Sequence, residues 1–123
     1  MAEKYNEIPE FEKDFKKLLK RFYTLREDIE NMKKSLLEPY FSQKILVSGV
    51  PKMEGFCGEN YASYKVKSFA CAALKGKGRC SGMRIILVYH KEEREITFIE
   101  IYFKGNRKNG DKERLQVFIK NLQ

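Results

Sequence analysis

The chain has 123 residues, enough for one domain with one hydrophobic core and too few for two ordinary domains. Hydrophobic residues make up 42% of it, which is typical of a packed globular protein and excludes a disordered chain. Lys and Arg number 25 against 17 Asp and Glu, and the net charge of +8 predicts an anionic partner: nucleic acid, an acidic membrane surface or an acidic protein.

No segment reaches the roughly 18 to 20 apolar residues that span a bilayer, and residues 1–7 lack the apolar run of a signal peptide, so we expect a cytoplasmic protein. Cys57, Cys71 and Cys80 contain no Cys-x-x-Cys pair, and their spacing from His90 does not match that of zinc ligands. We therefore expect free thiols, no metal and no cofactor. His90 has no visible partner in the sequence and is expected at the surface.

The first elements expected are a short strand over residues 5–8 and an amphipathic helix. Pro9 suits the opening turn of a helix, where its missing N–H group has no partner to lose. Apolar residues then recur at helical spacing, with basic residues between them. We expect this apolar stripe to pack in the core: Phe11, Phe15, Leu18, Leu19 and Phe22.

A second helix is expected directly after the first. Thr24 and Glu27, three residues apart, form the pattern of a capping box. Pro39 disfavours helical geometry in the residue before it, so this helix should end near Leu37. Two helices joined by so short a connection form a hairpin.

The segment over residues 40–60 begins with a short apolar run at 45–47, which predicts a short strand. Glycines and a proline follow this run and predict a loop: Gly49, Pro51, Gly55 and Gly58.

Three longer strands are expected next. The first covers residues 61–70, with an extension to Leu74. The second covers 82–90 and is apolar nearly throughout, as expected of a central strand. The third covers 96–103 and is rich in β-branched and aromatic residues. The charged residues 91–94 form the turn between the last two.

After a polar loop over residues 106–111, a closing helix is marked by Leu115, Phe118, Ile119 and Leu122. Helices segregated from a run of strands predict an α+β fold, in which an N-terminal helix hairpin packs on a small antiparallel sheet. We expect residues 1–123 to form a single domain.

Lys65 and Lys67 are the first candidate site residues. They are one residue apart on an expected strand, so both project from the same face. Arg84 enters the next strand just after Gly82. Three such cations with no carboxylate interleaved suit the binding of a phosphodiester and of the charge that develops during its cleavage. Their repulsion should lower the pKa of the lysines, which favours a general base. Spacing alone is equally compatible with the solvated face of an edge strand.

Two further basic segments are candidates for contacts with a nucleic-acid backbone. The segment 75–82 lacks the residue order of a phosphate loop and precedes a strand rather than a helix, so a solvated turn is the alternative. The candidate residues of this first segment are Lys75, Lys77 and Arg79. The second segment lies just beyond the last expected strand, and its candidates are Lys104, Arg107 and Lys108.

The order of these elements, with Tyr-Lys-Val-Lys at 64–67 and Ser-Gly-Met-Arg-Ile-Ile at 81–86, resembles the RelE/ParE superfamily of toxins from type II toxin–antitoxin systems, in particular its RelE and HigB branches. The segments 8–18 and 96–104 resemble the N-terminal segment and the last strand of that family. The resemblance covers about residues 5 to 115. It implies a helix hairpin on a small, twisted antiparallel sheet with a basic concave face.

The resemblance to the RelE branch also implies an activity: cleavage of messenger RNA on the ribosome by attack of a 2′-hydroxyl on the adjacent phosphate, without a metal. Lys65 and Lys67 then correspond to the lysines that act as base and charge stabilisers. Arg84 corresponds to the arginine that stabilises the transition-state phosphate. The implied partners are messenger RNA, the ribosome and a cognate antitoxin that is acidic, partly disordered and DNA-binding.

Two departures from the family pattern leave alternatives open. Met83 stands where an aromatic residue is common, and no tyrosine follows Tyr102, whereas some members use one near the end. The missing tyrosine leaves open a toxin that has lost catalysis and still binds its antitoxin. A non-enzymatic toxin that binds DNA gyrase, as in the ParE branch, is the other alternative, because the same fold serves both branches.

Overall fold

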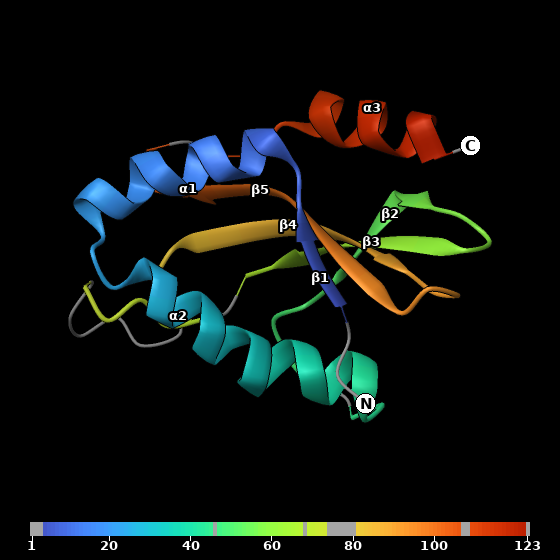
Figure 1. The fold of residues 1–123 in the computed structure, drawn as a ribbon, viewed down its shortest axis with the longest axis horizontal. Coiled ribbons are helices and arrows are strands. Elements are labelled where there is room, and N and C mark those ends of the chain that lie inside the picture. The colour runs from blue at the N-terminus through green and yellow to red at the C-terminus, as the bar shows by residue number, and fades with distance from the viewer. Residues whose placement is uncertain (1–3, 46, 68, 74–80, 107–108, 123) are drawn as a thin grey trace.

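The computed structural model describes residues 4–45, 47–67, 69–73, 81–106 and 109–122. Its strands form one sheet in the order β1-β5-β4-β3-β2, and helices flank it (Figure 1). The elements in chain order are β1 (Lys4–Glu7), α1 (Pro9–Arg21), α2 (Leu25–Met32), η1 (Lys33–Ser42), β2 (Lys52–Cys57), β3 (Tyr61–Val66), β4 (Met83–His90), β5 (Glu95–Phe103) and α3 (Lys112–Leu122).

β4 lies at the centre of the sheet, as its nearly continuous apolar sequence predicted, and β5 lies beside it. All neighbouring strands pair antiparallel except β1, which runs parallel to β5 with Tyr5 opposite Ile96. The predicted α+β fold, with a helix hairpin and a closing helix, is confirmed; the expectation of a purely antiparallel sheet fails only at β1. No helix in the described ranges is long and apolar enough to cross a membrane.

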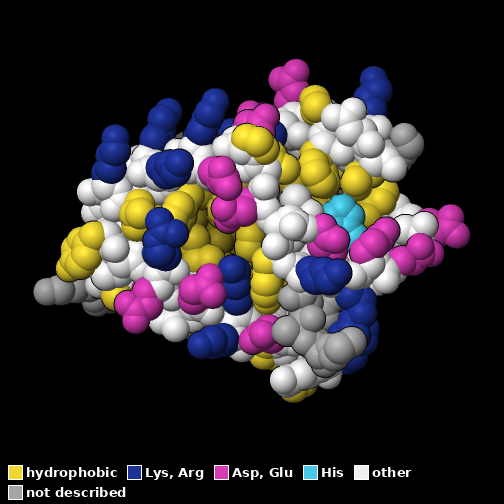
Figure 2. Space-filling model, viewed as in Figure 1, with side chains coloured by type: hydrophobic (Ala, Val, Ile, Leu, Met, Phe, Trp, Pro, Cys, Tyr) yellow, Lys and Arg dark blue, Asp and Glu magenta, His cyan; other side chains and the backbone are white. Residues whose placement is uncertain are grey.

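The two faces of the sheet carry different hydrophobic clusters. One face packs against α1, α2 and η1 and includes Phe11, Leu87 and Phe98, all essentially buried. The other face packs against α3 through Ile86 and Leu115 among others. On β4 the two sets of side chains alternate, as the period of a strand requires. Lysines and arginines stand along the outer side of α1, away from both clusters (Figure 2).

The second helix does not end near Leu37, so that prediction was wrong. The chain continues from α2 into a π-helix, η1, that passes through Pro39. In an α-helix the proline ring would clash with the carbonyl group four residues earlier. The wider π turn removes this clash, and the N–H of Gln43 donates to the carbonyl of Glu38, five residues back, at 3.2 Å.

The segment between η1 and β3 also differs from the expectation. Ile45 and Val47 lie outside any strand, whereas residues 52–57 of the expected loop form the edge strand β2. Gly55 adopts a φ of +85°, which only glycine takes without strain, and the pairing of β2 with β3 shifts register there. Beyond it, β3 ends at Val66, short of the predicted strand.

The capping box predicted at Thr24 is absent, because its side chain binds elsewhere. The Thr24 hydroxyl donates to Asp28 at 2.7 Å and accepts the N–H of Ala73 at 2.9 Å. Asp28 is buried and accepts the N–H of Ala72 at 3.2 Å. The first turn of α2 therefore holds the segment that follows β3.

Candidate nucleic-acid interface

Lys65, Lys67 and Arg84 lie on the face of the sheet opposite α1 and α2. Lys65 pairs with Ile86 on β4, and Ile86 belongs to the hydrophobic cluster that packs against α3. When this register is continued by two residues, Lys67 lies opposite Arg84. The N–H groups of Lys65 and Lys67 donate to the carbonyls of Pro51 and Gly49 at 3.0 and 2.7 Å. The chain therefore stays extended past Val66, and the two lysines share a face. We call this surface the basic face.

The guanidinium of Arg84 is held against the backbone. Its Nη1 donates to the carbonyl of Lys67 at 2.9 Å and to that of Met83 at 3.2 Å. The first bond crosses from β4 to the end of β3 and brings Arg84 together with Lys67. Arg84 remains partly exposed, so its charge lies at the surface with its orientation fixed by two acceptors.

Lys65 is half-buried on the basic face. Burial lowers the pKa of its ammonium group, and the charges of Lys67, Lys112 and Arg84 lower it further. Glu100 acts in the opposite direction. The sequence predicted a lowered pKa for Lys65 and attributed it to repulsion between cations. The direction is confirmed, but burial is the larger cause.

An open pocket of about 250 Å³ lies on the basic face between β2, β3 and the start of α3. Its charged lining has four lysines and one carboxylate, namely Lys52, Lys65, Lys67, Lys112 and Glu54. Sequence reasoning missed Lys52 and Lys112. Neither stands in a motif, and only the packing of α3 beside β2 brings them to the catalytic candidates.

Glu100 is a fully buried carboxylate beside this cationic surface, and sequence reasoning missed it as well. It lies on β5 opposite Ile86, which is in turn opposite Lys65. Its Oε1 accepts the N–H of Asp111 at 2.7 Å. Gly110 packs so closely that an added Cβ would lie 2.8 Å from this oxygen and 2.6 Å from Ile86 Cδ1. Glu100 therefore anchors the turn that leads into α3, through this hydrogen bond and the close packing of Gly110.

Arg114 fastens the first turn of α3 to the rest of the molecule. Its Nη1 forms an ion pair with Asp14 of α1 at 2.6 Å and donates to the carbonyl of Ile99 at 3.1 Å. Burial alone would lower the pKa of Arg114, but the hydrogen bond and charge of Asp14, with the charges of Glu100 and Asp111, raise it. The contacts of this arginine are structural.

The remaining predicted contact residues are placed only in part. Lys104 is exposed at the end of β5, and its N–H donates to Gly82 at 2.8 Å, so it lies at the Arg84 end of the basic face. The other candidates lie outside the described residues: Lys75, Lys77, Arg79, Arg107 and Lys108.

His90 is not the plain surface histidine that was expected. Its Nε2 is 2.9 Å from the hydroxyl of Thr97, and its ring packs edge-on against Phe118 of α3. Cys71 is buried and Cys57 exposed, both as free thiols, and burial raises the pKa of Cys71. Within the described part of the chain, no three His, Cys, Asp or Glu side chains gather as metal ligands would.

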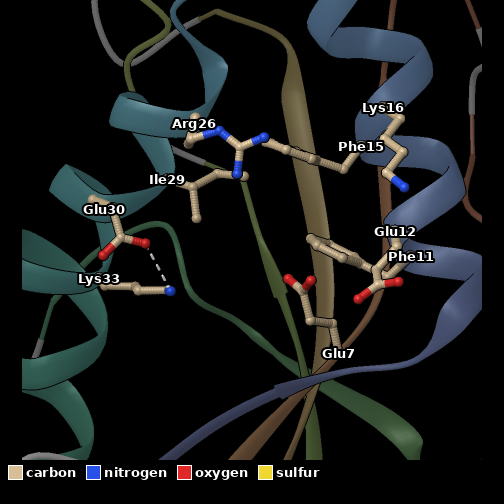
Figure 3. A pocket seen from close by; sticks show the side chains of 9 residues that line it. All are labelled: Glu7, Phe11, Glu12, Phe15, Lys16, Arg26, Ile29, Glu30 and Lys33. Carbon is tan, nitrogen blue, oxygen red and sulfur yellow. Dashed lines mark hydrogen bonds and ion pairs between the residues drawn. The ribbon is translucent and has the colours of Figure 1, made fainter.

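A second pocket of similar volume lies on the other side of the sheet, between α1 and α2 (Figure 3). Its charges are mixed: Glu7 and Glu12 face each other at one end, and Lys33 pairs with Glu30 at 2.8 Å (Figure 3). Burial, with the nearby charge of Glu12, raises the pKa of Glu7. Because its cations are balanced by carboxylates, this pocket is a poorer site for a polyanion than the basic face.

Lys65→Gln is expected to stabilise the protein at neutral pH, with a rise in Tm of about 1–3 °C, because like charges in contact cost a few tenths of a kcal/mol. The folded-state pKa of Lys65 is lowered, so its proton is held more weakly in the folded than in the unfolded chain. The gain should therefore be full below the lowered pKa and shrink as pH rises toward the ordinary lysine value. Thermal melts between pH 7 and 10 measure it. Lys120→Gln on α3 is the control, and equal effects of the two variants would contradict the electrostatic account.

The sheet, with its helix hairpin on one face and α3 on the other, forms an α+β fold that is also found among solved structures. A chain in the crystal structure of the archaeal RelE–RelB complex from Pyrococcus horikoshii OT3 superposes with a TM-score of 0.52. The match covers 85% of this chain and 98% of that chain at 16% sequence identity, and confirms the fold that the sequence resemblance implied. No family model matches the sequence, and no curated protein does.

Proposed function

We propose that this protein is the toxin of a type II toxin–antitoxin system and cleaves messenger RNA on the ribosome. The observation that carries the proposal is the gathering of Lys65, Lys67 and Arg84 on the face of the sheet opposite α1 and α2, in a fold similar to that of RelE. Lys112 adds a further positive charge to the same surface. A toxin that only binds gyrase has no need of such a phosphate site.

The chemistry that suits these residues is transesterification within the RNA chain. The 2′-oxygen loses its proton and attacks the adjacent phosphorus, which forms a 2′,3′-cyclic phosphate. The bond to the 5′-oxygen of the next nucleotide breaks, and that oxygen takes up a proton. Negative charge builds on the non-bridging oxygens in the transition state, where preorganised cations contribute most.

Each cation then has a role that follows from its surroundings. Lys65 is the base, since its lowered pKa increases the fraction that is neutral near physiological pH. Lys67 stabilises the phosphate with its positive charge. Arg84, held through Nη1, presents the Nε and Nη2 edge of its planar fork to two phosphate oxygens.

The partner we propose is an antitoxin with an acidic, partly disordered segment that covers the basic face. The RelE chain of similar fold was crystallised in complex with RelB. A chain with a net charge of +8 and a cationic pocket attracts such a segment over a long range.

Cleavage should become faster with rising pH, about tenfold per pH unit below the lowered pKa of Lys65, because only the neutral amine can accept the proton. Single-turnover rates on programmed ribosomes between pH 6.5 and 8.5 measure this. Lys65→Gln should flatten the profile and lower the rate about 10²-fold. Lys91→Gln in the β4–β5 turn is the control. A wild-type profile that is flat, or a slope that survives in Lys65→Gln, would assign the base elsewhere.

Induction of the protein in cells, followed by mapping of transcript ends, separates the candidate functions. The nuclease predicts new ends within translated codons. Intact transcripts with broken chromosomal DNA would instead indicate action on gyrase, and intact transcripts without growth arrest would indicate a toxin that has lost catalysis.

A further inference from the structure

Lys112 occupies a defined position beside the catalytic candidates. It is the first residue of α3, it is exposed, and it lines the same pocket as Lys65 and Lys67. The positive charge of Lys112 lowers the pKa of Lys65, and its effect is larger than the effect of the Arg84 charge. The cations that face Lys65 thus come from the end of β3, from β4 and from α3, whereas the carboxylate of Glu100 faces it from β5.

The backbone on both sides of Lys112 is held by partly buried polar contacts. Before it, the N–H of Asp111 donates to the fully buried Glu100 at 2.7 Å, and Gly110 leaves no space for a Cβ. After it, Arg114 is bonded to Asp14 and to the carbonyl of Ile99, and its own N–H donates to Asp111 at 3.1 Å. These contacts fix the position from which the Lys112 side chain reaches the pocket.

Lys52 of β2 also lines this pocket. Among the described residues that line the pocket, Glu54 is the one carboxylate beside four lysines. Met53 and Phe56 form an apolar wall of the pocket. Both pack against the hydrophobic cluster between the sheet and α3. Cations beside an aromatic wall are the combination with which proteins bind single-stranded nucleic acid.

We propose that Lys112 and Lys52 form a second anion subsite, which binds the backbone phosphate next to the one that is cleaved. The identity of the ligand as RNA rests on the proposed function. Glu100 and Gly110 are positioning residues: they fix the turn that carries Lys112 and do not touch the RNA.

Binding of a fully 2′-O-methylated RNA of about eight nucleotides tests the subsite without cleavage, because the attacking hydroxyl is blocked. Lys112→Gln should weaken binding about 3- to 10-fold at low salt and reduce the slope of log affinity against log salt by about 0.7, the value for one phosphate contact in a single strand. Lys120→Gln, a lysine in the last turn of the same helix, removes the same charge and should leave the slope unchanged.

Equal slopes for these two variants would overturn the subsite, even if the wild-type protein cleaves RNA. A protein that shows the Lys112-dependent slope but never cleaves would overturn the nuclease and leave the subsite intact. The two failures are therefore distinguishable.

The positioning role has its own readout in a double-mutant cycle. Gly110→Ala should reduce the salt slope as Lys112→Gln does, because the added Cβ displaces the turn from Glu100 and Ile86. The double variant should then lose no more than either single one. Additive losses would show that the turn does not position Lys112.

Discussion

Arg84→Ala should abolish growth arrest on induction and lower the rate of RNA cleavage about 10²- to 10³-fold, the usual loss when one preorganised transition-state donor is removed. The fold should survive, because Arg84 is partly exposed and water can replace its Nη1 at the carbonyls of Lys67 and Met83. Colony counts after induction and single-turnover cleavage on programmed ribosomes measure the two effects.

Two variants make this result specific. Arg84→Lys keeps a positive charge but loses the planar fork, so an intermediate rate is expected. Arg26→Ala removes an arginine of α2 that stacks on Phe15 on the other side of the sheet, and it should remain toxic. A folded Arg84→Ala protein that stays fully toxic would defeat the assignment of Arg84.

Glu100→Ala should destabilise the fold by about 3 kcal/mol, because it leaves the N–H of Asp111 without its buried acceptor and removes a negative charge close to Arg114. Urea denaturation followed by circular dichroism measures the loss. Glu100→Gln should cost less, since the amide oxygen can still accept the N–H of Asp111.

Glu92→Ala in the exposed β4–β5 turn is the control for a lost carboxylate, and its stability should stay within about 0.5 kcal/mol of the wild type. If Glu100→Ala were as stable as Glu92→Ala, the carboxylate could not be the support on which the start of α3 is built.

Much of the fold could be predicted because the local signals agree with one another. The stripe that includes Phe11 predicted α1, and the apolar runs predicted β4 and β5. Period two placed Lys65 and Lys67 on one face without any knowledge of the fold.

The errors arose where a local rule met an exception that packing stabilises. Pro39 normally ends a helix, but the π turns of η1 admit it while Leu37 and Phe41 stay buried. Gly55 normally marks a loop, yet here it gives β2 an irregular register against β3. Neither outcome follows from the residues of the segment alone, because pairing and burial decide it.

Glu100 shows why part of the site was beyond sequence reasoning. Phe98 faces α1 and α2. Strict alternation along β5 would place Glu100 on that same face. The register instead pairs Leu87 with Phe98 and Ile86 with Glu100, so Ile99 is the extra residue of a β-bulge. The bulge turns Glu100 to the basic face, where it supports the turn before Lys112.

The chemistry of the RNA ends tests the central claim most directly. Ribosomes programmed with a defined messenger RNA are treated with the purified protein, and the products are mapped at single-nucleotide resolution. We predict upstream fragments that end in a 2′,3′-cyclic phosphate, downstream fragments that begin with a 5′-hydroxyl, and no cut where the attacking 2′-hydroxyl is replaced by hydrogen. Fragments with a 3′-hydroxyl and a 5′-phosphate, or cleavage that persists at the 2′-deoxy position, would contradict attack by the 2′-oxygen within the site of Lys65, Lys67 and Arg84.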